Sequence, residues 1–501
     1  MFSTRCYTRG LMTLWLCLLT LPVAAQSFRI QCPTSTSLHP PVNGQSNPAI
    51  KCQQISGGDG YATMADGTQT YLFAFGPLSG LSDIANGLPG TQPNSVFNVA
   101  YDGLAPFDPT LPYMGSSPNG AVGLAPDPMA GGAITGHVDP RPIMDVGVMN
   151  GNIPAPMMAI DEDDEFFLTL TNVGMIMRPD LFEQHTVHFH GYPNAAAFYD
   201  GVPDASVAIN IGGSFTYYYL APDAGTYFWH CHITPPEHLQ MGMVGQLYVR
   251  PRQNRVISGT LYGGLQAQQG DLRTACGTDI LCSNPLPANQ GVLPGQTTPT
   301  PGAPGKKYAY NDGDGSTAYD VEYPIQIHGF DPNFHFVGMT FNPEPFTDMK
   351  DKYFLLNGRS YPDTVTPGAL QTQSADGATH FSQPLPTIIN ITAGQRALLR
   401  ISDLDVTEYQ TLTSLGIRMQ VVGYNAKLLR DQAGNNMYYT TNSITLAGGE
   451  SLDVLLDTSI PKPDGSAYTK GEVYYLYTPN LDHLSNDAEN FGGLMTEVHI
   501  N

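Results

Sequence analysis

The sequence predicts an all-β protein built from two tandem β-sandwiches, and three observations support this fold class. The 501-residue chain is rich in glycine (53 residues) and proline (42 residues). Convincing hydrophobic periodicity of 3.6 residues is nearly absent, which argues against long amphipathic helices. Short runs of β-branched and aromatic residues are instead separated by turn residues, which is the pattern of sandwich folds.

The predicted strands are spread along the chain. The clearest runs are 167–171, 214–220, 245–249, 387–401, 451–456 and 472–477. Residues 77–150 contain many prolines and glycines, so we expect an irregular elaboration on the first sandwich. A faint internal repeat links the two sandwiches, because Asn150–Pro154 resembles Asn357–Pro362 and Gly212–Ser214 resembles Gly448–Ser451.

Composition along the chain predicts four regions. Residues 1–25 are predicted to be a signal peptide, since Arg5 and Arg9 precede an apolar run and small residues precede Gln26. Residues 26–255 are predicted to form the first sandwich domain, 256–305 a disulfide-containing Pro/Gly-rich linker, and 306–501 a second sandwich domain that lacks the clustered histidines and cysteine of the first. No later segment is long and apolar enough to span a bilayer. We therefore expect an exported protein, periplasmic or extracellular.

The chain is acidic, with a formal net charge of −22 at pH 7. This charge argues against nucleic acid and anionic membranes as partners. It favours cationic substrates, including metal ions, or a basic partner, although acidity also keeps an exported protein soluble.

Five cysteines lie beyond the predicted signal peptide, and an oxidising compartment should pair those that can pair. Cys32 with Cys52 and Cys276 with Cys282 are the local choices, although sequence does not fix the connectivity. Cys231 is then left between two histidines, where a metal explains it better than a stray thiol.

Four residues around Cys231 have the chemistry of a blue copper site. His185, Cys231, His238 and Met243 supply two imidazoles, a thiolate and a thioether, which are the ligands of an electron-transfer (type 1) copper. The first ligand comes early, and the other three come from one later segment.

The remaining histidines of this region form two His-x-His pairs, His188 with His190 and His230 with His232. In an extended strand, residues i and i+2 face the same side. His230 and His232 flank Cys231, so their side chains should point opposite to its thiol. A second copper held by these pairs would have a short covalent path to Cys231.

These motifs resemble the multicopper oxidase family, the laccase-like proteins. The matching elements are His185–Gly191, the His-Cys-His…His…Met element of 230–243, Asp200–Pro203 and Gly225–Tyr227. The resemblance covers 140–255 strongly and 320–501 more weakly. It implies two cupredoxin-like Greek-key sandwiches, with His185, Cys231, His238 and Met243 as type 1 copper ligands. It also implies that His188, His190, His230 and His232 are half of a type 2/type 3 cluster that reduces dioxygen to water.

The chain departs from that family in its histidine count, because a complete cluster uses eight histidines. No other His-x-His pair occurs among the remaining histidines, which are His39, His137, His328, His335, His380, His483 and His499. Two copies of the first domain facing each other across a two-fold axis would supply four plus four histidines. We accordingly expect a homo-oligomer.

Copper nitrite reductases are the alternative resemblance, since their second copper uses about three histidines, one from a neighbouring chain. His190 and His230 would match two, with His328, His335, His380 or His483 as the third. Those enzymes have an acidic residue where this chain has His188, and no histidine at the position of His232, which favours the oxidase.

The predicted function is an exported copper oxidoreductase. It takes single electrons from a phenolic or metal-ion donor and passes them through Cys231, His230 and His232 to dioxygen. The alternatives are a copper nitrite reductase and a non-catalytic blue-copper electron carrier or copper-binding protein.

Overall fold

The computed structural model describes residues 29–103, 115–191, 196–221, 223–255, 307–338, 345–373, 377–431 and 434–501. The predicted signal peptide and the predicted linker 256–305, with Cys276 and Cys282, lie outside these residues. Strands dominate the described part of the chain, so the prediction of a mostly-β protein is confirmed. The division into two tandem Greek-key domains stays a prediction.

Two sheets form the N-terminal half. The first has the order β2-β1-β5-β7, with β3 beside β1. Its strands are β1 (Ile50–Thr63), β2 (Gln69–Pro77), β3 (Gln92–Pro93), β5 (Glu165–Gly174) and β7 (Ser214–Leu220). The second has the order β4-β9-β8-β6. Its strands are β4 (Met158–Asp161), β6 (His188–Phe189), β8 (Gly225–His230) and β9 (Val244–Arg250).

Two larger sheets form the C-terminal half. One has the order β13-β12-β17-β23-β19-β20, with β21 beside β19, and the other has the order β16-β25-β24-β18-β22. The strands of the first are β12 (Val321–Phe330), β13 (Tyr353–Leu356), β17 (Arg396–Asp403), β19 (Met419–Tyr424), β20 (Lys427–Leu428), β21 (Tyr439–Thr441) and β23 (Ser451–Asp457). Those of the second are β16 (Ile389–Ile391), β18 (Gln410–Leu415), β22 (Ser443–Leu446), β24 (Val473–Tyr477) and β25 (Met495–Ile500). Two small hairpins are β10 (Lys307–Tyr308) with β11 (Ala318–Tyr319) and β14 (Leu370–Gln373) with β15 (Thr379–Gln383).

The two halves repeat the same strand pairings. In the N-terminal half β1 pairs antiparallel with β2 and parallel with β5, and β12 does the same with β13 and β17. Likewise β4 runs parallel to β9, as β16 does to β25. The faint sequence repeat therefore corresponds to a repeat in topology, since matching sequence motifs precede matching strands.

Helices are short and lie in the connections. They are α2 (Leu81–Ala85), α3 (Asn94–Phe97), α4 (Pro140–Gly147), α5 (Pro235–Gln240) and α7 (Pro332–Gly338). Single 3-10 turns are η1 (Pro128–Ala130), η2 (Ala197–Tyr199), η3 (Arg252–Arg255), η4 (Phe346–Asp348), η5 (Asp363–Val365) and η6 (Leu481–His483). In the described part of the chain, no helix has the length and apolar character needed to cross a membrane. In the described residues of 78–150 the structure has three short helices, η1 and the two-residue strand β3. The assignment of this segment as an elaboration of the first domain stays a prediction.

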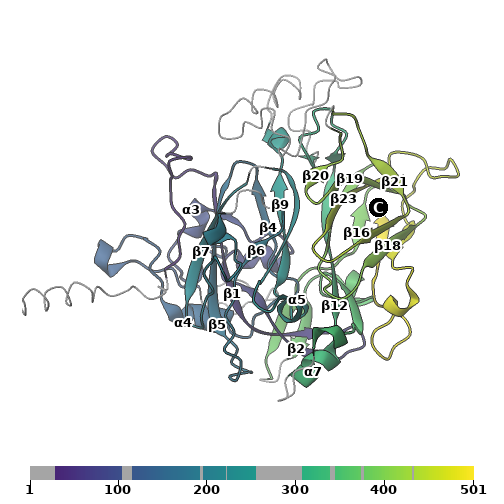
Figure 1. Ribbon diagram of the computed structural model, residues 1–501. Helices are drawn as coiled ribbons and strands as arrows, with labels where there is room; N and C mark the ends of the chain where they lie inside the picture. The colour runs from purple at the N-terminus through teal and green to yellow at the C-terminus, as the bar shows by residue number, and fades with distance from the viewer. Residues whose placement is uncertain are drawn as a thin grey trace, which may run out of the picture.

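Figure 1 shows the strands up to β9 on one side of the molecule and those from β12 onward on the other. Each half has its own large apolar core, and β8 lies against β17 and β23 where the halves meet. Because β8 leads directly into Cys231, the junction between the halves lies next to the predicted copper ligands. Residues of the C-terminal half can therefore contact the segment that carries these ligands.

The six predicted strand segments correspond to strands, with 387–401 divided into β16 and β17 by a turn. Sequence reasoning missed β1, which is the longest strand in the described residues. Its Gly57, Gly58 and Gly60 weaken the usual strand pattern, since glycine is depleted in strands. All three glycines have close neighbours that a side chain would displace.

A buried ion network joins the two halves at β9, β12 and β17. The guanidinium groups of Arg250 and Arg400 lie 2.9 Å and 3.0 Å from the carboxylate oxygens of Glu322. Burial alone would raise the pKa of Glu322, but the two neighbouring guanidinium groups outweigh burial and lower its pKa to about 2. Glu322 is therefore ionised at neutral pH and holds β9 and β17 together.

This network predicts a specific acid sensitivity. The pKa of Glu322 is depressed in the folded state, so its contribution to stability is present above the ordinary value of 4.5 and is lost as pH falls towards about 2. We expect the urea midpoint to fall over this range, and to fall less in a Glu322→Gln variant. Equal pH slopes in the two proteins would contradict this assignment.

Candidate metal centre

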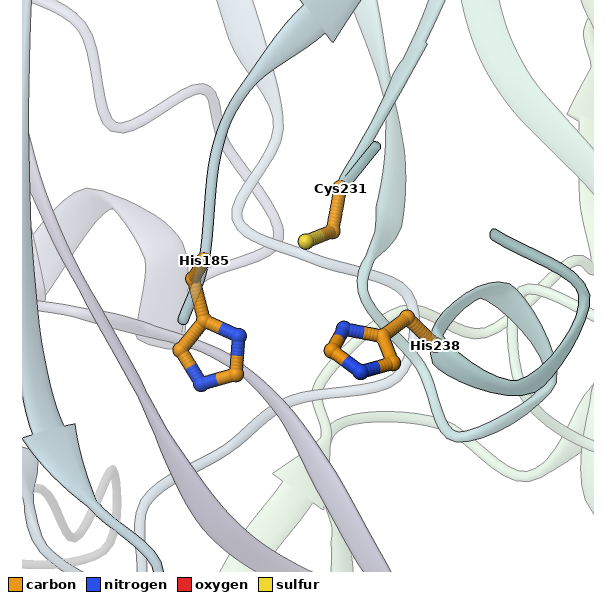
Figure 2. Close-up of side chains that lie close together, drawn as sticks. All are labelled: His185, Cys231 and His238. Atoms are coloured by element: carbon orange, nitrogen blue, oxygen red, sulfur yellow. The ribbon is translucent and has the colours of Figure 1, made fainter. Parts of the chain in front are cut away.

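The structure brings together a first group of three potential metal ligands, His185, Cys231 and His238 (Figure 2). One ligand atom of each lies within 4.8 Å of those of the other two, and all three side chains are buried. His185 precedes β6 and pairs with Ile209 in an isolated bridge, Cys231 directly follows β8, and His238 lies in α5. The predicted proximity of the early histidine to the later cysteine and histidine is confirmed.

The hydrogen bonding of this group fits a bound metal ion. Both ring nitrogens of His185 and Nδ1 of His238 are buried and have no hydrogen-bond partner among the described residues. An unsatisfied buried polar atom costs about 1–3 kcal/mol, which a metal bond would offset. The backbone N–H of Thr186 donates to Sγ of Cys231 at 3.4 Å, so the sulfur is held in place by the segment that carries His185. A thiolate with two imidazoles fits copper.

Charges around this group act differently on its two histidines. Burial lowers the pKa of His185 well below its ordinary value, so this ring is neutral and free to bind a metal. Burial also opposes the charged form of His238, but the Cys231 thiolate and the Glu183 carboxylate together raise its pKa to about 9. Metal binding at His238 therefore displaces a proton.

Met243, the fourth predicted ligand, is fully buried beside this group. Its backbone carbonyl accepts a hydrogen bond from the N–H of Cys231 at 3.0 Å, and its own N–H donates to the carbonyl of His238 at 2.9 Å. These bonds fix the backbone of the loop from 231 to 243. The axial role of the methionine sulfur stays a prediction.

Gly57 of β1 makes room for His185. A Cβ atom at position 57 would lie 2.7 Å from Cδ2 of His185, closer than van der Waals contact allows. The absence of a side chain at Gly57 therefore leaves the space that the imidazole of His185 occupies. Sequence reasoning did not single out Gly57, because its partner is 128 positions away.

Replacing Gly57 by alanine is expected to weaken copper binding at this group by about 10–100-fold, the usual effect of disturbing a residue behind a ligand. The added methyl group pushes the His185 ring from its position. Copper titration followed by the blue absorption measures the change. An unaltered titration in a variant with the wild-type unfolding midpoint would contradict it.

A second group contains His188, His190 and His230, whose ligand atoms also lie within 4.8 Å of one another. His188 and His230 are direct partners in the β6–β8 register. The Nε2 atoms of His190 and His230 face each other at 3.0 Å. Burial lowers the pKa of His190 to about 4 and that of His230 well below its ordinary value, so both rings are neutral at pH 7.

Backbone carbonyls orient two rings of this group. Nδ1 of His188 lies 2.6 Å from the carbonyl of Asp200, and Nδ1 of His230 lies 2.5 Å from that of Cys231. Because a carbonyl only accepts, these two Nδ1 atoms carry the proton and their Nε2 atoms are left to bind a metal. The third ring, that of His190, lies against the backbone of Gly449.

His232 lies at the edge of this group. Its ring centroid is 5.1 Å from that of His188 and 5.6 Å from that of His230. The four histidines predicted as cluster ligands are thus brought together, with three of them more tightly grouped. Cys231 belongs to the first group and its neighbour His230 to the second, so the chain passes directly from one group to the other.

The other histidines of the described residues join neither group. In the C-terminal half, His328 and His335 are hydrogen bonded to Gln240 of α5, and His483 is hydrogen bonded to Gln410 and Glu408. His328, His335 and His483 are therefore buried hydrogen-bonding residues. The third ligand that the nitrite reductase alternative requires from a neighbouring chain stays untested.

Gln240 is a functional neighbour that sequence reasoning missed. Its side chain donates to Asp351 and accepts from the backbone N–H of Asp331 and from His335. These contacts attach α5, and therefore His238, to the C-terminal half. No local pattern signals such a role, because every partner lies at least 88 positions further along the chain.

A pocket of about 380 Å³ opens beside the second group. His190, Phe228 and His230 line one side, and Asp405, Glu408 and Tyr409 of the C-terminal half line the other. A small molecule in this pocket would reach the histidines.

The structure describes three of the five cysteines beyond the predicted signal peptide, and the pairing of Cys276 with Cys282 stays a prediction. Cys32 and Cys52 form a disulfide, which indicates an oxidising compartment. Within the described ranges Cys231 is the free cysteine, and it is buried.

Comparisons with known proteins agree with this geometry. The family model described as "Multicopper oxidase" matches residues 135–254. Over 112 residues the chain is 34% identical to multicopper oxidase MCE of Talaromyces pinophilus, covering 22% of this chain and 17% of that protein. Over 106 residues it is 33% identical to a copper-containing nitrite reductase of Neorhizobium galegae, covering 21% and 25%. The match thus spans only a minor part of each relative.

Among solved structures, the chain is similar to a blue copper oxidase from Nitrosomonas europaea. The TM-score is 0.48 at 16% identity, and the match covers 90% of this chain and 85% of that one.

The family match covers both groups of potential ligands, from His185 to Met243, and the strands that carry them. The segment 135–254 is therefore similar to the multicopper oxidase family.

Proposed function

We propose that this protein is a copper-dependent oxidoreductase that removes single electrons from a small donor and delivers them to dioxygen, which is reduced to water. His185, Cys231 and His238 would hold a type 1 copper, with Met243 as axial ligand. The second copper site, of type 2 or type 3, would use His188, His190, His230 and His232. Copper, when bound, supplies the one-electron chemistry that amino-acid side chains lack.

The observation that carries this proposal is the junction at Cys231. Its thiol belongs to the first group, and the next residue back, His230, belongs to the second. Nδ1 of His230 is also hydrogen bonded to the carbonyl of Cys231. An electron leaving the thiolate therefore has a path of a few bonds to the second group. A protein that used one group alone would not need this arrangement.

Electrons would enter at His238. Its Nε2 lies 3.8 Å from the carboxylate of Glu183, whose side chain is about one-third exposed. A carboxylate at this position suits a donor that is positively charged or that releases a proton when oxidised. A reduced metal ion and a phenol both meet this description, and the acidic chain favours the first.

We also propose that the repeated strand pairings reflect two tandem cupredoxin-like sandwiches, 26–255 and 306–501. The Cys32–Cys52 disulfide supports export to the periplasm or the cell exterior. A homo-oligomer remains part of the proposal, since four histidines are half of a complete cluster.

The pocket beside the second group favours dioxygen over nitrite. Two carboxyl-bearing residues, Asp405 and Glu408, line it, and the facing His190 is neutral because burial lowers its pKa to about 4. An anion entering this pocket would not be attracted by the neutral histidines and would be repelled by the carboxylates. A neutral molecule is not repelled by the carboxylates and does not need a positive charge on the histidines.

Copper stoichiometry, oligomeric mass and oxygen uptake together test the function. We expect at least two copper ions per chain, an intense blue absorption, a near-ultraviolet band of coupled coppers, and oxygen consumption with a phenol or ferrous donor. One copper per chain with no oxygen uptake would indicate an electron carrier. Nitric oxide formation from nitrite would indicate a reductase.

A further inference from the structure

We propose that the turn Ala447–Glu450 of the C-terminal half is a positioning element of the histidine group, acting through Gly449 on His190. The turn joins β22 to β23 and is held on both sides. The N–H of Gly449 donates to the carbonyl of Asp403 at 2.8 Å, and the N–H of Glu450 donates to that of Ala447 at 3.1 Å. The identity of the metal rests on the proposed function, whereas the orientation of His190 does not.

The contact between Gly449 and His190 is close and directional. A Cβ atom at position 449 would lie 2.9 Å from both Nδ1 and Cε1 of His190. On the far side of the ring from Nδ1, Nε2 of His190 faces Nε2 of His230 at 3.0 Å. The turn thereby fixes the direction in which the ring presents Nε2 to the group.

Two constraints require glycine at this position. Its φ of +89° lies in the region that residues with a Cβ adopt only at a cost. Any side chain would also occupy the space of the His190 imidazole. The first constraint concerns the backbone alone, and the second concerns the histidine. An experiment can therefore separate them.

His190 differs from its two neighbours in the source of its support. His188 and His230 are hydrogen bonded to carbonyls of Asp200 and Cys231, both in the N-terminal half. Only His190 of these three depends on the C-terminal half. Metal binding at the group and packing of the two halves are consequently linked, and each should strengthen the other.

The test compares Gly449→Ala with Gly394→Ala. Gly394 has a nearly identical φ of +90°, but nothing lies within 4 Å of a Cβ there, so this variant reproduces the backbone strain without the contact. Nitrogen-15 NMR of histidine-labelled, metal-free protein reports the surroundings of each ring through the shifts of its two nitrogens. The signal of His190 is identified by its loss in His190→Gln.

We expect the same nitrogen shifts of His190 in the wild type and in Gly394→Ala, and altered shifts in Gly449→Ala. Copper affinity of the second group should fall about 10–100-fold in Gly449→Ala alone, with the blue absorption of the first group retained. Wild-type shifts of His190 in Gly449→Ala, or equal changes in both variants, would overturn the proposal. If the wild type binds copper at the first group alone, the proposed function fails, while the NMR comparison still decides the role of Gly449.

Discussion

Replacing Cys231 by serine is expected to abolish the blue absorption and reduce oxidase turnover to background. The hydroxyl of serine stays protonated and cannot replace the thiolate, whose strong bonding to copper gives the colour and the exit for the electron. Serine has nearly the same size, and Cys231 is fully buried, so packing should change little. Absorption spectra and oxygen uptake with a ferrous or phenolic donor measure the two effects.

This variant also separates the two metal groups. The second group consists of histidines, and the carbonyl of residue 231 that orients His230 is part of the backbone and remains. We therefore expect Cys231→Ser to keep copper at the second group. Retention of the blue colour would refute the role of Cys231. Loss of all copper, together with an unchanged unfolding midpoint, would refute the independence of the two groups.

Replacing Arg400 by methionine is expected to have the largest effect on stability. Arg400 is fully buried on β17, where it lies 3.0 Å from Glu322 and 3.6 Å from Asp453. Its guanidinium also stacks 4.6 Å above the ring of Tyr248 in β9. Removing one partner of a buried ion pair costs about 3–5 kcal/mol, because here the carboxylate of Asp453 stays buried without its guanidinium partner. Urea denaturation measures the loss in free energy of unfolding.

Arg141→Met is the matched control. Arg141 forms an ion pair with Asp139, but its side chain is 84% exposed. Water already solvates both charges there, so no measurable change is expected. Because Arg400 joins strands of both halves, Arg400→Met should also reduce copper retention at the second group, which depends on the C-terminal half through Gly449. A small loss of stability in Arg400→Met, similar to that of the control, would contradict this account of the network.

Local patterns predicted much of this fold. The runs 214–220 and 451–456 correspond closely to β7 and β23, because β-branched and aromatic residues between turns leave few alternatives. β1 was missed for the opposite reason: its glycines serve close packing against other segments. Close packing against distant segments cannot be predicted from the pattern of the neighbouring residues.

The sequence by itself determined which side chains could hold copper. The spacing of His188 with His190 and of His230 with His232 around Cys231 is local, and strand geometry converts it into two faces without knowledge of the rest of the chain. The tertiary structure alone decided how these ligands are oriented. Gly57 and Gly449 reach the site from segments that are distant in the sequence, and Gln240 anchors α5 through contacts to the C-terminal half. Their effect depends on packing distances of a few tenths of an ångström, which arise only when the sheets meet.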